Sequence, residues 1–160
     1  MNYNKDLPLT LGGEITPRVV IYKSESHKLH QAFVPKLVSE TSNERVKILQ
    51  SQPVALTKDG EIEPYTGAQG QIYLGIAATD SINPAYPAKR NFPIEVTVMV
   101  EAYAICNYVS KEAMDCGYVK PTGDTLNNHF IIVEESEAET KFIAINPADE
   151  ENEVVQVLIR

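Results

Sequence analysis

The chain has 160 residues, of which 43% are hydrophobic and 22% are charged, a composition typical of a globular protein. A chain of this length predicts one domain that buries enough surface to fold without disulfides or metals. Its formal net charge of −8 disfavours nucleic acid and anionic membranes as partners, because both attract positive charge. No stretch approaches the roughly 18 apolar residues of a transmembrane helix. The first eleven residues lack the apolar core of a signal peptide.

Residues 1–44 predict an extended N-terminal arm. Gly12-Gly13 and Pro35 interrupt regular structure, and Pro17–Tyr22 is the one segment with the composition of a strand. A long segment without periodicity is often ordered only on a partner. Four apolar residues are expected to anchor the arm on that partner, namely Val19, Ile21, Phe33 and Leu37.

Residues 45–160 predict a mainly β domain, a small antiparallel barrel or sandwich, because short apolar runs alternate with turn residues. The expected strands are residues 46–49, 53–57, 61–65, 71–79, 93–108, 130–134, 140–145 and 154–159. Ser110–Cys116 predicts a single helical turn, and Lys120–Gly123 predicts a turn. Gly75 predicts a bulge or a close backbone approach within its strand. Since this domain has its own apolar core, a chain beginning at Asn43 is expected to fold.

The longest expected strand covers residues 93–108. Apolar and polar residues alternate along it, which is the period of a half-buried strand. The apolar face consists of Ile94, Val96, Val98, Val100, Ala102, Ala104 and Cys106. Val96 and Val98 are therefore expected to be buried.

The two cysteines favour a reducing, cytoplasmic setting for folding. Cys106 and Cys116 are too few for a disulfide scaffold or an all-cysteine zinc site, and their pairing depends on Cβ geometry that a sequence does not carry. Cys106 and His129 could be imagined as a nucleophile and its base. However, Cys106 falls on an apolar strand face, where a thiol is inert and its pKa tends to rise, so we expect it to be a packing residue.

Motifs for enzymatic chemistry are missing. The sequence contains no dinucleotide-binding glycine motif, P-loop, nucleophile elbow or His-Glu-x-x-His motif. No nucleophile, base and orienting group can be assembled from it. We therefore expect no catalytic residue, no cofactor and no metal site, and a protein that is not an enzyme.

Three features leave alternatives open. His27 and His30 are spaced to share a metal if locally helical, but two ligands make a weak site, and two exposed or interface histidines are the simpler interpretation. Residues 134–153 hold eight acidic side chains and no glycine, which excludes an EF-hand and favours solvated turns over a looser calcium site. Three tyrosines near loops, Tyr65, Tyr73 and Tyr86, either cap the sheet edge or form a glycan or protein contact surface.

One ordered run of segments goes further than composition. It begins with Gln52–Leu56 and an Asp-Gly turn at Asp59-Gly60, continues with a Gly-Ile-Ala segment at Gly75–Ala77, and ends in the valine-rich strand from Pro93. This run resembles the β-rich decoration, or auxiliary capsid, proteins of tailed-bacteriophage heads. The resemblance covers about residues 45–110 well and residues 111–160 only in general style. It does not include residues 1–44.

The resemblance implies a structural virion protein that binds the outer surface of a phage capsid and stabilises it by bridging capsomers. The implied partners are the major capsid protein and neighbouring copies of the chain, for instance in a homotrimer, and not nucleic acid or membrane. The implied location is the capsid surface, after synthesis in the host cytoplasm. The alternative function is a carbohydrate- or protein-binding β-sandwich module of a fibre or adhesin.

Overall fold

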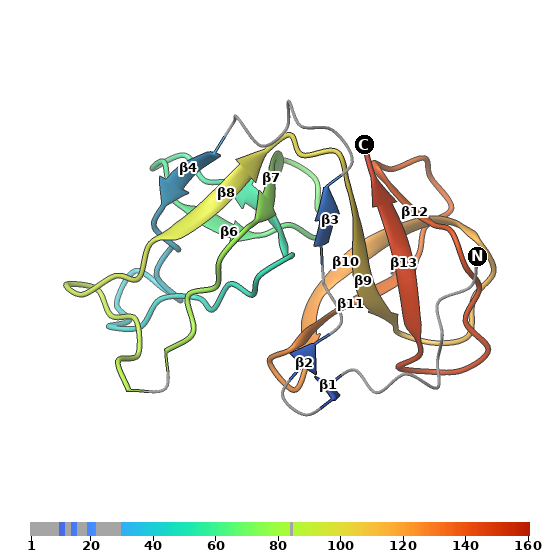
Figure 1. The fold of residues 1–160 in the computed structure, drawn as a ribbon. Coiled ribbons are helices and arrows are strands. Elements are labelled where there is room, and N and C mark those ends of the chain that lie inside the picture. Colours follow the sequence, from blue (N-terminus) through green and yellow to red (C-terminus); the bar gives the residue numbers. More distant parts are fainter. Residues whose placement is uncertain (1–9, 12–13, 16–18, 22–29, 84) are drawn as a thin grey trace. The chain divides into compact units, whose positions relative to one another are not determined.

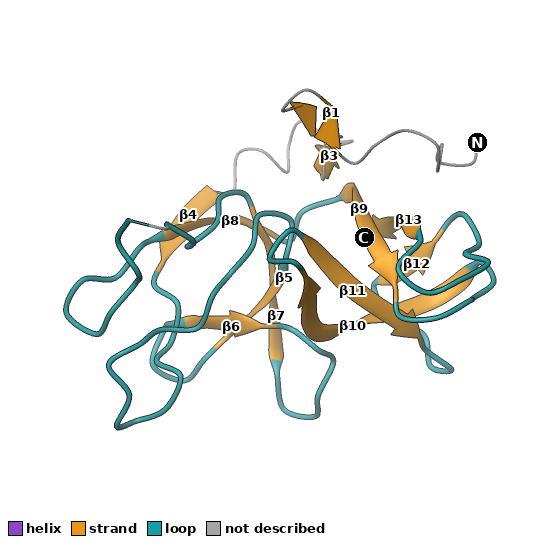
Figure 2. Ribbon diagram, turned by 90° about the horizontal axis from the view of Figure 1, so that it is seen from below, coloured by secondary structure: helices purple, strands orange, loops and turns teal. Residues whose placement is uncertain are grey.

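The computed structural model describes residues 10–11, 14–15, 19–21, 30–83 and 85–160. These residues form strands, turns and loops without any helix (Figure 2), which confirms the predicted mainly β class. The helical turn expected at Ser110–Cys116 is not formed. That segment is a loop in which Met114 makes an isolated bridge to Ala148. Over the described part of the chain, no helix has the length and apolarity needed to cross a membrane.

The chain forms two compact units. We call Glu25–Ala102 the inserted unit, and Tyr103–Arg160 together with Met1–Ser24 the terminal unit, because both chain ends belong to the latter. Neither boundary coincides with the one predicted at residue 44.

The terminal unit is a closed five-stranded barrel. Its strands are β9 (Ala104–Ser110), β10 (Gly117–Leu126), β11 (Phe130–Glu135), β12 (Phe142–Ala144) and β13 (Val154–Ile159). They follow the order β11-β10-β12-β13-β9, and β11 closes the circuit by pairing in parallel with β9. The strand β3 (Val19–Ile21) adds to β9 beside the barrel (Figure 1). The two remaining strands, β1 (Thr10–Leu11) and β2 (Glu14–Ile15), pair with each other.

The inserted unit contains a second sheet of five strands. They are β4 (His30–Phe33), β5 (Pro53–Leu56), β6 (Ile62–Pro64), β7 (Ile72–Ala77) and β8 (Val96–Val100), in the order β4-β8-β7-β5-β6. The backbone that follows β4 then reaches β6 through a parallel bridge between Pro35 and Ile62. Two hydrogen bonds flank this bridge, from Ile62 N to Val34 O at 3.0 Å and from Lys36 N to Ile62 O at 2.9 Å.

The two units share one strand circuit. We number the five strands of each unit in chain order, from β4 to β8 in the inserted unit and from β9 to β13 in the terminal unit. In both units, strand one pairs with five, five with four, four with two, and two with three, and all these pairs are antiparallel. The circuit closes where strand three meets strand one in parallel. The registers correspond as well. The pairs Gln31–Val98, Ala77–Val98, Val54–Gly75, Val54–Pro64 and Pro35–Ile62 match Cys106–Val157, Ala144–Val157, Val119–Phe142, Val119–Glu135 and Ser110–Val133.

The long strand expected at residues 93–108 is not continuous. β8 ends at Val100 and β9 begins at Ala104, because Glu101 has a φ of 50°, in the left-handed region that ends an extended strand. The longest strand is instead β10, which runs through the turn expected at Lys120–Gly123 with a register shift between Pro121 and Thr125. A bulge thus replaces the predicted turn.

Part of the expected arm belongs to the inserted unit. β4 pairs along its length with β8, from His30 opposite Met99 to Phe33 opposite Val96. A chain beginning at Asn43 would lack β4 and the bridge to Ile62. Its folding, expected from the sequence, is therefore not supported. Residues 1–9, 12–13, 16–18 and 22–29 of the arm lie outside the described residues.

Two packing predictions are confirmed. Val96 and Val98 are fully buried in a core cluster of the inserted unit with Ile48, Val54, Ile62 and Ala77. Gly75 marks a close approach, since a Cβ atom at this position would collide with the carbonyl oxygen of Met99. The neighbouring β5–β7 ladder also carries a register shift, between Val54 and Ala55. The segment expected as a strand at residues 46–49 is a loop, although Ile48 and Leu49 are buried.

Candidate interaction surface

The connection between β7 and β8 presents large apolar side chains to solvent. Within this aromatic loop, defined here as residues 81–93, Tyr86 is 74% exposed and Phe92 is 76% exposed. Their rings are the most exposed large hydrophobic side chains of the part of the chain that the structure describes. Exposed aromatic residues of this kind are enriched at protein interfaces.

The aromatic loop is fastened to the rest of the inserted unit by Arg45. Its guanidinium donates to the carbonyl oxygens of Lys89 and Arg90 in the loop, at 3.1 and 2.9 Å. It also donates to Pro35 O at 2.8 Å and to the Glu61 carboxylate at 2.7 Å. The Arg45 side chain is only 10% exposed, so it has exchanged most of its hydration for these fixed bonds.

A second arginine, Arg90, lies in the aromatic loop itself and donates hydrogen bonds to residues outside it. The Arg90 guanidinium donates to the carbonyl oxygens of Glu40 and Ser42, the latter at 2.7 Å. The Arg90 backbone N–H donates to Asn43 O at 2.9 Å. Each arginine therefore bonds carbonyl groups on the other's segment. Irregular loops are usually the more mobile parts of a fold, whereas these bonds tie the loop to the neighbouring segments at Lys89 and Arg90.

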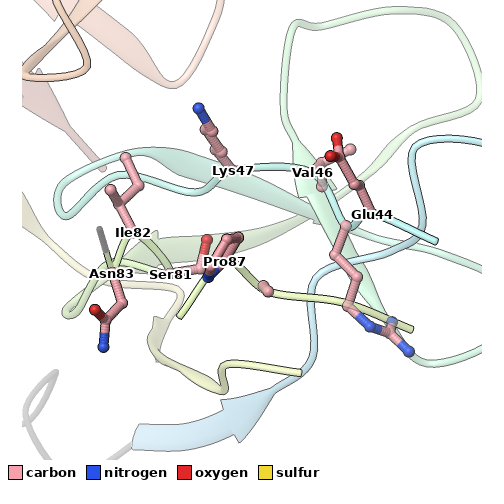
Figure 3. A pocket seen from close by; sticks show the side chains of 9 residues that line it. Glu44, Val46, Lys47, Ser81, Ile82, Asn83 and Pro87 are labelled. Carbon is pink, nitrogen blue, oxygen red and sulfur yellow. The ribbon is translucent and has the colours of Figure 1, made fainter. Parts of the chain in front are cut away.

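A hollow of about 290 Å³ lies at the base of the aromatic loop. Figure 3 shows side chains that line it, from the aromatic loop (Ser81, Ile82, Asn83 and Pro87) and from the segment of residues 44–47. Its lining mixes the apolar side chains of Val46, Ile82 and Pro87 with polar groups. Such a hollow has room for one side chain of a partner beside the exposed rings.

The four predicted anchor residues lie in both units. Val19 and Ile21 are in β3, with their backbones opposite Cys106 and Ala104. Phe33, in β4, packs against the core of the inserted unit, and Leu37 makes an isolated bridge to Arg45. Their role as anchors on a partner stays a prediction.

The three tyrosines noted in the sequence divide into two environments. Tyr65 and Tyr73 pack edge to face, with ring centroids 5.2 Å apart, and both are half-buried. Tyr86 is exposed on the aromatic loop. Phe92 was missed in the sequence because a phenylalanine beside prolines normally indicates core packing. Its position in the irregular loop, two residues after Arg90, was the available signal.

The groups considered for chemistry are not part of the aromatic loop. Cys106 is fully buried, and this burial raises its pKa to about 12, whereas Cys116 is exposed, and both thiols are free. His30 is exposed on β4, and His27 lies outside the described residues. Within the described ranges, no three His, Cys, Asp or Glu side chains are placed to hold a metal ion.

Comparisons with known proteins return no protein-family model and no curated protein that matches this sequence. Functional interpretation therefore depends on the surface itself and on the sequence resemblance.

Proposed function

We propose that this protein is a structural component of a phage virion that binds the outer surface of the capsid and bridges capsomers. The observation that carries the proposal is the aromatic loop, which presents two exposed rings and is bonded to neighbouring segments by Arg45 and Arg90. The resemblance of residues 45–110 to decoration proteins supplies the class of partner, the major capsid protein.

A fastened loop suits a protein whose task is to bind. Ordering a mobile loop on binding reduces the affinity, and a preformed surface avoids most of this cost. Contacts that are weak individually become strong when they are repeated across a lattice with linked partners. Two compact units in one chain also offer two sets of surfaces, as bridging requires.

The proposal is tested by co-sedimentation of the protein with undecorated shells. Tyr86→Ser and Phe92→Ser remove exposed rings without touching the core. We expect each to weaken attachment by roughly 30-fold, the effect of losing an interface hot spot. Ile72→Ser is the matched control, because Ile72 is 62% exposed in the same unit but lies on β7, outside the aromatic loop.

Equal attachment of all four proteins, including the wild type, would remove the aromatic loop from the interface. Absence of wild-type attachment, combined with binding to glycans that depends on Tyr86, would favour the fibre or adhesin module. Mass spectrometry of purified particles gives an independent check. A copy number comparable to that of the major shell protein is expected for a decoration protein.

A further inference from the structure

The shared circuit of the two units permits a comparison of their strand edges. In the terminal unit, β13 covers one edge of β9 from Ala104 to Val109. The opposite edge is shared by two strands. β11 pairs with Val109 and Ser110, while β3 pairs with residues 104–106. The N-terminal half of this edge is thus covered by a strand from outside the barrel circuit.

The corresponding edge of the inserted unit belongs to β4. β8 covers one edge of β4, and on the opposite edge Pro35 meets Ile62, as Ser110 meets Val133. His30 and Gln31 precede Pro35 by the same spacing as Ile105 and Cys106, which β3 covers, precede Ser110. No strand of the described part of the chain pairs with this edge at His30–Ala32.

Exposure differs accordingly between the matched positions. Ile105 is half-buried and Cys106 is fully buried in the terminal unit, whereas the matched His30 and Gln31 are exposed in the inserted unit.

The backbone of β4 has groups directed toward this edge. Val34 O and Lys36 N bond to Ile62 on that side. Because hydrogen-bonding groups alternate along a strand, the N–H and C=O groups of His30 and Ala32 point to the same side as those of Val34 and Lys36. An edge of this kind is a template for another strand.

We propose that the His30–Ala32 edge of β4 accepts an extended, β-branched segment of another protein, as the edge of β9 accepts the Val-Val-Ile sequence of β3. Among the residues that the structure describes, two edges correspond in this way and one strand, β3, covers one of them. Transfer of β3 to a neighbouring copy's β4 would uncover its own β9 edge and gain no net pairing, so a foreign strand is favoured over a second copy. The identity of the foreign strand rests on the proposed function, which assigns it to the major shell protein. Backbone pairing would supply affinity, and alternate side chains would supply register.

The proposal is tested by removing one outward N–H. Ala32→Pro deletes this donor, and the β4–β8 ladder retains its bonds because the Ala32 N–H points away from β8. Ala32→Thr is the matched control, since it keeps the N–H and favours a strand. We expect Ala32→Pro to weaken attachment to undecorated shells by roughly tenfold, and Ala32→Thr to attach like the wild type. Equal attachment of both variants would overturn the assignment of the shell strand to this edge.

A second measurement is independent of shells and of the proposed function. The probe is a peptide with the sequence Pro-Arg-Val-Val-Ile-Tyr, residues 17–22 of the chain, added to the full-length protein. We expect it to slow hydrogen exchange at the Ala32 amide in the wild type, which tests the edge even if shells are not bound. Unchanged exchange at Ala32 with saturating peptide would overturn the strand-acceptor site. Wild-type self-association that Ala32→Pro abolishes would overturn the foreign strand and assign the edge to a second copy.

Discussion

The inserted and terminal units reach the same strand circuit with different closures. The terminal barrel closes through two parallel pairs, Val109–Ile132 and Ser110–Val133, whereas the inserted barrel closes through the single bridge Pro35–Ile62. The hydrogen bonds of the inserted closure are made by Val34 and Lys36, whose backbone groups point toward β6. The two units thus share the order and register of their strands but differ in the number of parallel pairs that close the circuit.

Both closures are reinforced in the same place. Directly after the closing pair, Lys36 forms an ion pair with Glu63 in the inserted unit. In the terminal unit Lys111 pairs with Glu134 at 2.9 Å, again one residue beyond the last closing pair on each strand. A cross-strand ion pair thus continues the parallel pairing in each barrel. The repeated position indicates that this closure is a weak point common to the circuit.

The largest expected effects come from placing a charge in one core at a time. Val98→Asp buries an unpaired carboxylate in the inserted unit, and Val157→Asp does so in the terminal unit, where Val157 is fully buried. Each is expected to cost more than about 4 kcal/mol and to unfold its own unit. Residue-resolved NMR measures which unit is lost. Loss of both units in both variants would show that the barrels depend on each other, and a normally melting Val98→Asp protein would show that its face is not the core.

A smaller effect is expected where β7 and β8 approach closely. Gly75→Ala forces a Cβ atom against Met99 O and is expected to destabilise the inserted unit by about 3 kcal/mol. Gly70→Ala is the control, because its Cβ atom meets no neighbour and only its positive φ, 88°, opposes alanine. Denaturant titration measures both. Equal destabilisation would mean that the strands separate to admit the methyl group.

Cys106 reports on the terminal unit alone. Because burial raises the pKa of its thiol to about 12, thiol reagents are expected to label it slowly at neutral pH while Cys116 reacts quickly. Cys106→Ala is expected to cost roughly 1–2 kcal/mol. Rapid labelling of folded protein at Cys106 would contradict its packing role and reopen an enzymatic function.

The smallest effect concerns the inserted closure and pH. The hydrogen bond from Lys36 holds the pKa of Glu63 below its usual value of 4.5, despite an opposing effect of burial. The pair therefore stabilises the inserted unit above that value, and this contribution is lost as pH falls through the lowered pKa. The loss is expected to stay below about 1 kcal/mol, since both side chains are partly exposed. Glu63→Gln should remove this pH dependence from the unfolding free energy, and its persistence would assign the dependence to another group.

Local features were predictable from the sequence where one residue type has one structural use. Alternation indicated the burial of Val98, and Gly75 indicated close strand packing. The break between β8 and β9 was not predictable, because apolar alternation continues across it and the left-handed residue is Glu101, neither glycine nor asparagine. β4 was assigned to the arm because His-Gln-Ala-Phe has no strand pattern of its own and is formed by pairing with β8. The arginine bonds of the aromatic loop join residues some 45 positions apart, which no local pattern indicates.

The placement of β3 and β13 on opposite edges of β9 determines how a pulling force would pass through the molecule. Both strands run antiparallel to β9, and Figure 1 shows them on either side of it. We expect tension applied between Val19–Ile21 and Val154–Ile159 to be carried by the hydrogen bonds of β9, while the inserted barrel, which the chain enters after Ile21 and leaves before Ala104, carries no load. Three-residue β3 would release first. The force would then pass through the chain of the inserted unit, which would extend under tension while the terminal barrel stays attached.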